Sequence, residues 1–161
     1  MTTTVPEGLS IALHQHAKGV AVVTAGLATP VGFCATSLAP VSLDPPLLSF
    51  AINTESASWA VIETAEHVSV NLLADDQEDV ARAFSRPGAE KFGPATRWYR
   101  DSAGLPALRG VLCRWRIAPL ERVRVGRHSL VIGLVVAVER GSPAKSPLVH
   151  YGGRYGRLDR A

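Results

Sequence analysis

The apolar residues of this 161-residue chain fall mainly into short runs bounded by Gly, Pro and polar clusters, which is typical of β-strands. Helical spacing is rarer and predicts helices over 6–18, from Ser56 or Ser58 to Thr64, and over 75–84. The segment 85–108 has no clean period and is expected to be an irregular excursion. Strands are expected at 20–25, 32–37, 47–52, 68–72, 111–124, 128–138 and 154–158.

The first three strand-like runs, within 19–53, lack an ordinary polar face. This pattern predicts that something other than bulk water lies against them. Between Gly32 and Asp44 the chain is rich in small residues and hydroxyls, so that backbone amides can approach a flat ligand closely. The sequence therefore favours a planar ligand at one edge of the sheet.

Many strands, few helices and no internal repeat favour a mainly β protein, a closed β-barrel with peripheral α-helices, over a doubly wound sheet. The length predicts a single domain over 1–161, with its core at about 10–158. Only 19% of the residues are charged and 47% are hydrophobic, which indicates that a partner subunit or a ligand covers part of the surface. We expect a homo-oligomer.

The charge and motif content excludes several classes of function. A net charge of +3, with 17 basic residues against 14 acidic ones, lacks the concentrated basic field that nucleic-acid binding needs. The N-terminal residues do not resemble a signal peptide and no apolar run is long enough to span a bilayer, so a cytoplasmic protein without membrane contact is expected. Cys34 and Cys113 match neither a disulfide framework nor a zinc motif; we expect reduced thiols and no metal.

Tryptophans and arginines recur at strand and helix spacing. Trp59, Trp98 and Trp115 are expected to pack in the core or at an interface rather than to form a stacking platform. A solvated strand face or a dimer rim is expected for the alternating arginines, which are Arg114, Arg116, Arg122 and Arg124.

A phosphate-binding segment is expected where the third strand ends and a helix begins. Asn53, Ser56 and Ser58 lie there, and free amides and hydroxyls at such a junction can hold a phosphate. Lys91 could add a point charge. Helix capping by the serines is an alternative explanation of the same pattern. Glu55 opposes a phosphate nearby unless its side chain turns outward.

Taken together, several segments resemble the flavin reductases with an FMN-binding split barrel, the reductase partners of two-component flavin monooxygenases. The similarity extends from about Gly19 to Leu158. Its motifs are GVAVVTA, GFCATSLAPVSLDPPLLSFAIN, the Ser56/Ser58 pair, FSRPGAEKF, GRHSLVIGLVVAV and YGGRYGRL. The resemblance implies a homodimer, a flavin, FMN or FAD, in a groove near the subunit interface, and NADH or NADPH as the reductant.

The resemblance also implies a role for each matching position. The wall that contacts the isoalloxazine ring through backbone groups corresponds to Cys34, Ala35, Thr36, Ser37, Ser42, Leu43 and Asp44. Asn53, Ser56 and Ser58 match the phosphate side, and the pair Lys91 and Phe92 matches one that closes over the flavin. His128 matches a histidine that would steady the nicotinamide amide or supply a proton. The C-terminal segment near the nicotinamide corresponds to Tyr151, Arg154 and Tyr155.

Two positions depart from the family's pattern. A basic residue often follows the asparagine and a serine comes next, but this chain has Thr54 and Glu55. An acidic residue usually precedes the histidine, but this chain has Arg127 before His128.

The function implied is an NAD(P)H:flavin oxidoreductase that transfers a hydride to FMN or FAD and passes reduced flavin by diffusion to a separate monooxygenase. Positioning of the two rings is then the main catalytic task. The alternatives are a flavin-binding electron carrier or cofactor store without nicotinamide oxidation, and a structural dimer that has lost its ligand.

Overall fold

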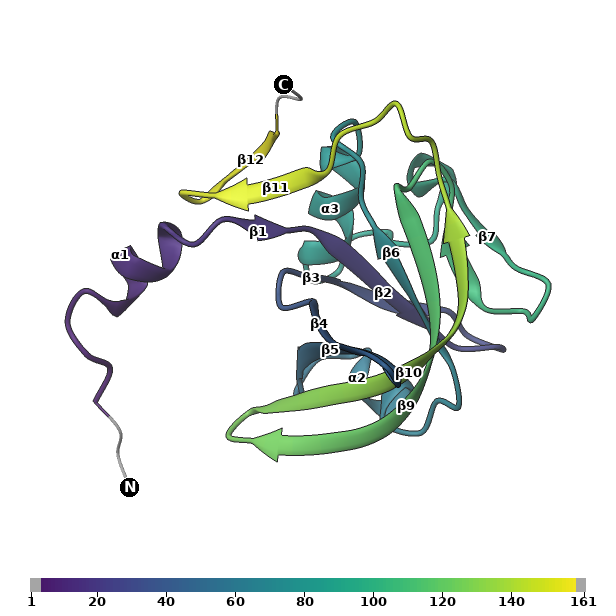
Figure 1. Ribbon diagram of the computed structural model, residues 1–161, viewed down its shortest axis with the longest axis horizontal. Helices are drawn as coiled ribbons and strands as arrows, with labels where there is room; N and C mark the ends of the chain where they lie inside the picture. Colours follow the sequence, from purple (N-terminus) through teal and green to yellow (C-terminus); the bar gives the residue numbers. More distant parts are fainter. Residues whose placement is uncertain (1–3, 159–161) are drawn as a thin grey trace.

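The computed structural model describes residues 4–158 and shows a β-rich protein with three short α-helices (Figure 1). Its helices are α1 (Leu9–His14), α2 (Trp59–Ile62), α3 (Glu78–Ser85) and the 3-10 helix η1 (Pro94–Thr96). Its strands are β1 (Lys18–Gly19), β2 (Ala21–Ala25), β3 (Val31–Ala35), β4 (Ala39–Leu43), β5 (Pro46–Asn53), β6 (Val68–Leu72), β7 (Trp98–Arg100), β8 (Pro106–Leu108), β9 (Cys113–Val125), β10 (His128–Arg140), β11 (Leu148–Tyr151) and β12 (Arg154–Arg157).

The main sheet has seven antiparallel strands in the order β3-β2-β6-β9-β10-β5-β4. It curls so that β3 returns toward β5, and a side chain joins them there: Ser37 Oγ accepts from the Ala51 N–H at 2.9 Å and donates to the Ala51 carbonyl at 3.3 Å. A smaller sheet, β1-β11-β12, lies at the edge of the molecule near α1 (Figure 1). The sequence prediction of a mainly β barrel with peripheral helices is confirmed.

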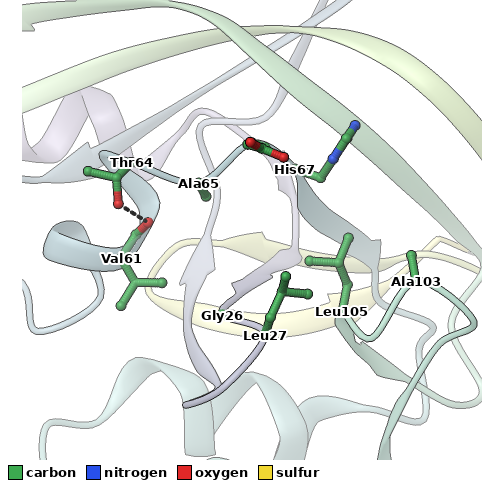
Figure 2. A pocket seen from close by; sticks show the side chains of 9 residues that line it. Gly26, Leu27, Val61, Thr64, Ala65, His67, Ala103 and Leu105 are labelled. Atoms are coloured by element: carbon green, nitrogen blue, oxygen red, sulfur yellow. Dashed lines mark hydrogen bonds between the residues drawn. The ribbon is translucent and has the colours of Figure 1, made fainter.

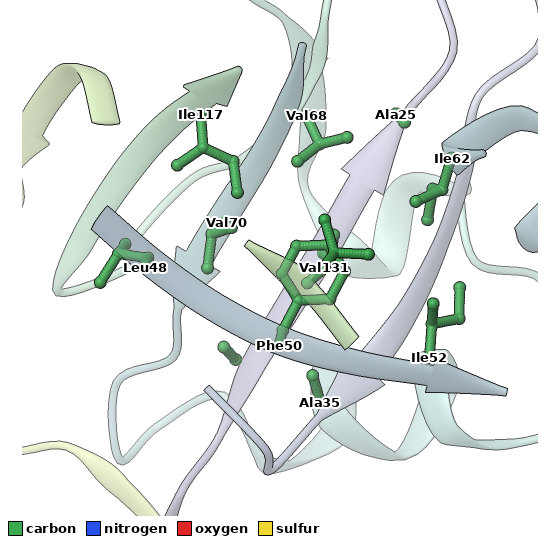
Figure 3. Packing of buried hydrophobic residues seen from close by; sticks show 12 residues of the cluster. Ala25, Ala35, Leu48, Phe50, Ile52, Ile62, Val68, Val70, Ile117 and Val131 are labelled. Atoms are coloured by element: carbon green, nitrogen blue, oxygen red, sulfur yellow. The ribbon is translucent and has the colours of Figure 1, made fainter. Parts of the chain in front are cut away.

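Strand β2 is buried along its whole length because it separates two hydrophobic cores. Its residues Ala21, Val23 and Ala25 face the barrel interior, where Phe50 and Val131 pack at the centre (Figure 3). Val22 faces the opposite way, toward the core under α3. The missing polar face of this strand is therefore explained by packing inside the protein, which covers it in place of bulk water.

The helices cover the barrel unequally. In α3, Val80, Ala81 and Phe84 are buried against β2 and β3, while Glu78 and Asp79 occupy the first turn, where the helix dipole favours acids. In α1 no residue is buried. No helix within residues 4–158 has the length and apolar character needed to cross a bilayer.

Some element boundaries differ from the sequence predictions. The N-terminal helix is limited to Leu9–His14, because Lys18 and Gly19 pair with β11 instead. The helix predicted from 75 begins at Glu78, and the helix expected up to Thr64 ends at Ile62. Strands β1, β4, β7, β8 and β11 were missed, since each is short and defined by its pairing partner rather than by its own periodicity.

The expectation that all four strand arginines lie on a solvated face is wrong for Arg114, whose side chain is 5% exposed. It donates to Asp101 Oδ2 at 2.6 Å and to the Ser69 hydroxyl at 3.2 Å, and it also pairs with Glu139. Arg122 donates to the carbonyls of α2 and the turn after it. The tryptophans pack against the two cores as expected.

Asp101 depends on this buried arginine for its charge. Burial alone would raise the pKa of Asp101, but hydrogen bonds from Arg114 and from the N–H groups of Leu105 and Ala103 outweigh it, and the pKa is lowered. A carboxylate whose pKa is lowered by folding contributes its full stabilisation above the unfolded-state pKa of about 3.9. That contribution is lost as the pH falls from this value through the lower folded-state pKa.

Replacing Asp101 with Ala is expected to lower the free energy of unfolding by about 3 kcal/mol at pH 7, because Arg114 then keeps only part of its pairing in a buried position. Urea denaturation measures the change. The variant should also lose less stability than the wild type between about pH 5 and pH 2. The matched control is Glu78→Ala, which removes an exposed ion pair with Arg82 and should leave the free energy of unfolding unchanged. Equal effects of the two substitutions would contradict the prediction.

Candidate functional site

The loop of residues 53–58 joins β5 to α2 and holds three of the predicted site residues. Asn53 organises the loop: its Oδ1 accepts from the Glu55 N–H at 2.9 Å and its carbonyl accepts from the Ser56 N–H at 3.0 Å. These two amides are therefore engaged within the loop and are not free to bind a phosphate.

The two serines of this loop do not cap α2. Ser58 makes no side-chain capping bond, and its hydroxyl donates to the Gly32 carbonyl of β3 at 3.1 Å. The Ser56 hydroxyl oxygen is buried and has no hydrogen-bond partner among the described residues. A buried hydroxyl without a partner is unfavourable unless a bound group satisfies it. Ser56 thus fits an external acceptor such as a phosphate oxygen.

The start of the loop is attached to the tip of the β9–β10 hairpin, called the hairpin tip below and formed by residues 124–128. The Thr54 N–H and hydroxyl both donate to the Arg127 carbonyl, at 2.9 and 3.1 Å. Arg124 donates to Thr54 Oγ1 at 3.3 Å, and Arg127 forms an ion pair with Glu55. His128 lies opposite Asn53 in the strand register. The structure therefore brings His128 next to the predicted phosphate-binding loop.

Strand β3 runs beside the same loop and the end of β5: Ser58 bonds Gly32 near its start, and the segment after its end reaches Ala51. Ala35 points into the barrel core and is 3% exposed, whereas Ser37 bonds both backbone groups of Ala51. Thr36 is half-buried between them. In the following strand β4 the Ser42 hydroxyl accepts from the Asp44 N–H at 3.2 Å, and Leu43 is 93% exposed. Of the predicted isoalloxazine wall, Leu43 and Asp44 on the edge strand β4 and the turn after it are exposed, whereas Ala35 is buried.

Cys34 belongs to a second group of residues, on the side of β3 that faces α3. Burial raises the pKa of the Cys34 thiol, although hydrogen bonds with Ser85 and Tyr155 lower it in part. The Tyr155 ring also lies 5.2 Å from the Arg82 guanidinium. The thiol is therefore held protonated at neutral pH and serves as a packing group rather than a nucleophile.

Phe92 packs in an aromatic row, with ring centroids 5.4 Å from Phe84 and 5.3 Å from Trp98. Lys91 precedes it, half-buried, and its carbonyl accepts from the Thr96 hydroxyl at 2.8 Å. The Lys91 and Phe92 pair is therefore fixed to the outer core next to α3.

The remaining predicted residues lie on the small sheet. Tyr151 and Arg154 flank the β11–β12 turn and are exposed, and the Gly152 N–H donates to the His14 carbonyl at 2.9 Å, which ties this turn to α1. Figure 1 places this sheet and the hairpin tip with His128 at opposite edges of the molecule. One chain therefore does not bring Tyr151 and Arg154 to His128.

A separate cavity of about 490 Å³ opens beyond the β2–β3 turn. Leu27, Leu105 and His67 line it from three segments (Figure 2). Its lining includes none of the predicted site residues, because it lies at the turn end of β3 while Cys34 to Ser37 lie at the other end. Its position gives no support to a flavin there.

Sequence reasoning missed two contacts in this region. Glu55 and Arg127 stand out in the sequence only as separate departures from a pattern, yet they bind each other. Ser85 stands in the quoted motif FSRPGAEKF without an assigned role, and its hydroxyl lies 3.5 Å from Tyr155 Oη. Neither contact has a signal in local spacing, since 72 and 70 residues separate the partners.

Residues 13–159 match the family described as flavin reductase like domain, and the chain belongs to this family. It is 39% identical over 150 residues to the NADH:FMN oxidoreductase of Rhodococcus qingshengii, covering 91% of this chain and 78% of that protein. The NADH:FAD oxidoreductase of Streptomyces globisporus C-1027, solved with NAD and FAD fragments, superposes with a TM-score of 0.88 at 25% identity over 98% of each chain. The flavin reductase component of a bacterial two-component tryptophan halogenase superposes with a TM-score of 0.86. It is 30% identical in sequence, and the match covers 95% of this chain and 98% of that one.

Proposed function

We propose that this protein is an NAD(P)H:flavin oxidoreductase that reduces FMN or FAD and releases the reduced flavin to a separate monooxygenase. Family membership supports the reaction class, and the names of the relatives support NADH, flavin and an oxygenase partner. The observation that carries the proposal in this chain is the buried, unpartnered Ser56 hydroxyl in the 53–58 loop. We also infer that residues 1–161 form one domain.

The proposed site assigns a separate task to each group of residues. Ser56, with Asn53 and Ser58 shaping its loop, would hold the flavin phosphate, and Lys91 would add a positive charge. Main-chain groups would face the ring at the positions from the resemblance, which are Cys34, Ala35, Thr36, Ser37, Ser42, Leu43 and Asp44. Phe92 would border the ring from the side of α3.

Bound flavin supplies the two-electron redox chemistry by accepting a hydride from the reduced nicotinamide. The protein's own task is to hold the two rings in a productive orientation and to exclude water. His128 is exposed at the start of β10 beside Asn53, where its ring can donate a hydrogen bond or a proton to a bound nicotinamide.

We infer that the working form is a homodimer. The β9–β10 hairpin exposes a row of apolar side chains that a monomer would leave in water. They are Leu120 (56% exposed), Val123 (45%), Val125 (65%), Leu130 (37%), Val136 (44%) and Val138 (55%). A second subunit packed on this hairpin would also allow Tyr151, Arg154 and Tyr155 of one subunit to approach His128 of the other.

Anaerobic mixing with NADH or NADPH is expected to bleach the flavin absorbance of the protein with FMN or FAD. All four pairings should be measured by stopped flow, because they also identify the preferred nicotinamide and flavin. Flavin binding without bleaching by either nucleotide would support the electron-carrier alternative and contradict the reductase.

The substitution Ser56→Ala is expected to weaken FMN binding about ten- to a hundredfold, because a hydrogen bond to a charged group contributes roughly 1.5–3 kcal/mol. Riboflavin has no phosphate, so its affinity should not change. Fluorescence titration measures both ligands. The matched control is Ser37→Ala, which removes a hydroxyl bonded within the chain and should lower stability without changing the ratio of FMN to riboflavin affinity. An unchanged FMN affinity in Ser56→Ala would refute the assignment.

The substitution Val123→Glu is expected to shift the protein from dimer to monomer in sedimentation velocity, because it places a charge in the apolar row. Val123 lies directly opposite Leu130 in the hairpin register, so the charge falls within this row. Leu27→Glu, at an exposed apolar position in the β2–β3 turn, serves as the control and should not change the mass. A wild-type protein that sediments as a monomer at micromolar concentration would contradict the homodimer.

A further inference from the structure

The contact between the hairpin tip and the 53–58 loop includes a pair of opposite charges, Glu55 and Arg127. Their side chains are 59% and 73% exposed, and ion pairs at such positions contribute little to stability. Fold stability therefore does not account for the pair. Its position indicates another role, because Glu55 directly precedes Ser56, whose buried hydroxyl lacks a partner among the described residues.

The backbone holds both members of the pair in register. Thr54 donates twice to the Arg127 carbonyl, at 2.9 and 3.1 Å, which fixes the hairpin tip against the loop. On the other side, the Glu55 N–H donates to Asn53 Oδ1 at 2.9 Å. The side chains thus meet without much further ordering, and the pairing is preorganised by the main chain.

An uncompensated carboxylate at position 55 would oppose an anion in this loop. Hydrogen bonding with Arg127, together with its positive charge, lowers the pKa of Glu55, so the carboxylate is ionised at neutral pH. Arg127 is bonded to Glu55, and a second arginine, Arg124, is bonded to the neighbouring Thr54. Two arginines against one glutamate leave this side of the loop with a net positive charge.

The same two positions are those at which the chain departs from the pattern of its family. The resemblance has a base and then a serine after the asparagine, where this chain has Thr54 and Glu55, and an acid before the histidine, where this chain has Arg127. The structure shows that the two departures are in contact.

We propose that Arg127 is a positioning residue for phosphate recognition: by binding Glu55 it draws that carboxylate toward the hairpin tip and neutralises it, so that the 53–58 loop accepts a phosphorylated flavin. The inference rests on the proposed function and concerns the phosphate end of the ligand only. Arg127 acts through Glu55, so removal of the glutamate makes the arginine unnecessary.

A double-mutant cycle tests the proposal by titrating FMN and riboflavin against the wild type, Arg127→Ala, Glu55→Gln and the double variant. Arg127→Ala is expected to weaken FMN binding about three- to tenfold, the effect of one unpaired charge several ångströms from a phosphate. Riboflavin affinity should stay within about twofold, as expected for a ligand without that charge. Glu55→Gln in the same chain should restore FMN affinity to that of the single Glu55→Gln variant.

Two further variants sharpen the result. Lys145→Ala breaks a different ion pair, with Asp76, and changes the net charge by the same amount, so it should not change FMN affinity. The exchanged pair, Glu55→Arg with Arg127→Glu, restores a neutral contact and should bind FMN within about threefold of the wild type. Raising the salt concentration should reduce the loss seen in Arg127→Ala.

Two results would overturn the proposal while leaving the reductase function intact. FMN binding by the double variant that is as weak as in Arg127→Ala would show that Arg127 contacts the phosphate directly. Equal FMN affinity in all four members of the cycle would show that the pair has no role in recognition. A wild type that binds none of FMN, FAD and riboflavin would overturn the proposed function together with this inference, so the two failures are distinguishable.

Discussion

The double burial of strand β2 is the constraint on which the rest of the structure depends. Val23 faces the barrel interior while Val22 faces the core under α3, so a single strand forms the wall between two apolar volumes. Because each face is covered by different elements, the barrel and its outer layer cannot separate without exposing this strand to water. This arrangement fixes β3, the neighbour of β2, and with it the edge at which the proposed flavin site lies.

The 53–58 loop is held from two directions by this framework. Ser58 ties it to β3 through the Gly32 carbonyl, and Thr54 ties it to the hairpin tip through the Arg127 carbonyl. A loop fixed at both ends loses little conformational freedom on binding, which favours affinity. The same attachment places His128 beside the loop. One rigid unit would therefore carry both the loop proposed for the flavin phosphate and the histidine proposed for the nicotinamide.

Two arginines of the β9–β10 hairpin form ion pairs in very different surroundings. Arg114 is buried and balanced by Asp101 and Glu139, whereas Arg127 is exposed and balanced by Glu55. The buried group is structural because an unpaired charge there would be very unfavourable. The exposed pair has little effect on folding, which leaves it free to adjust recognition at the site.

The sequence by itself determined the strand-rich class, the β2, β5, β6, β9 and β10 segments and the family, because alternation and motif residues are local properties of the chain. It also placed Asn53, Ser56 and Ser58 at a strand-to-helix junction. Only the tertiary structure decided that Asn53 occupies the loop amides, that Ser58 bonds Gly32 and that Ser56 is left without a partner. Likewise, the buried Arg114 pairs with Glu139, 25 positions away, and Glu55 pairs with Arg127, 72 positions away. Such contacts arise from sheet register and chain folding, which no local pattern encodes.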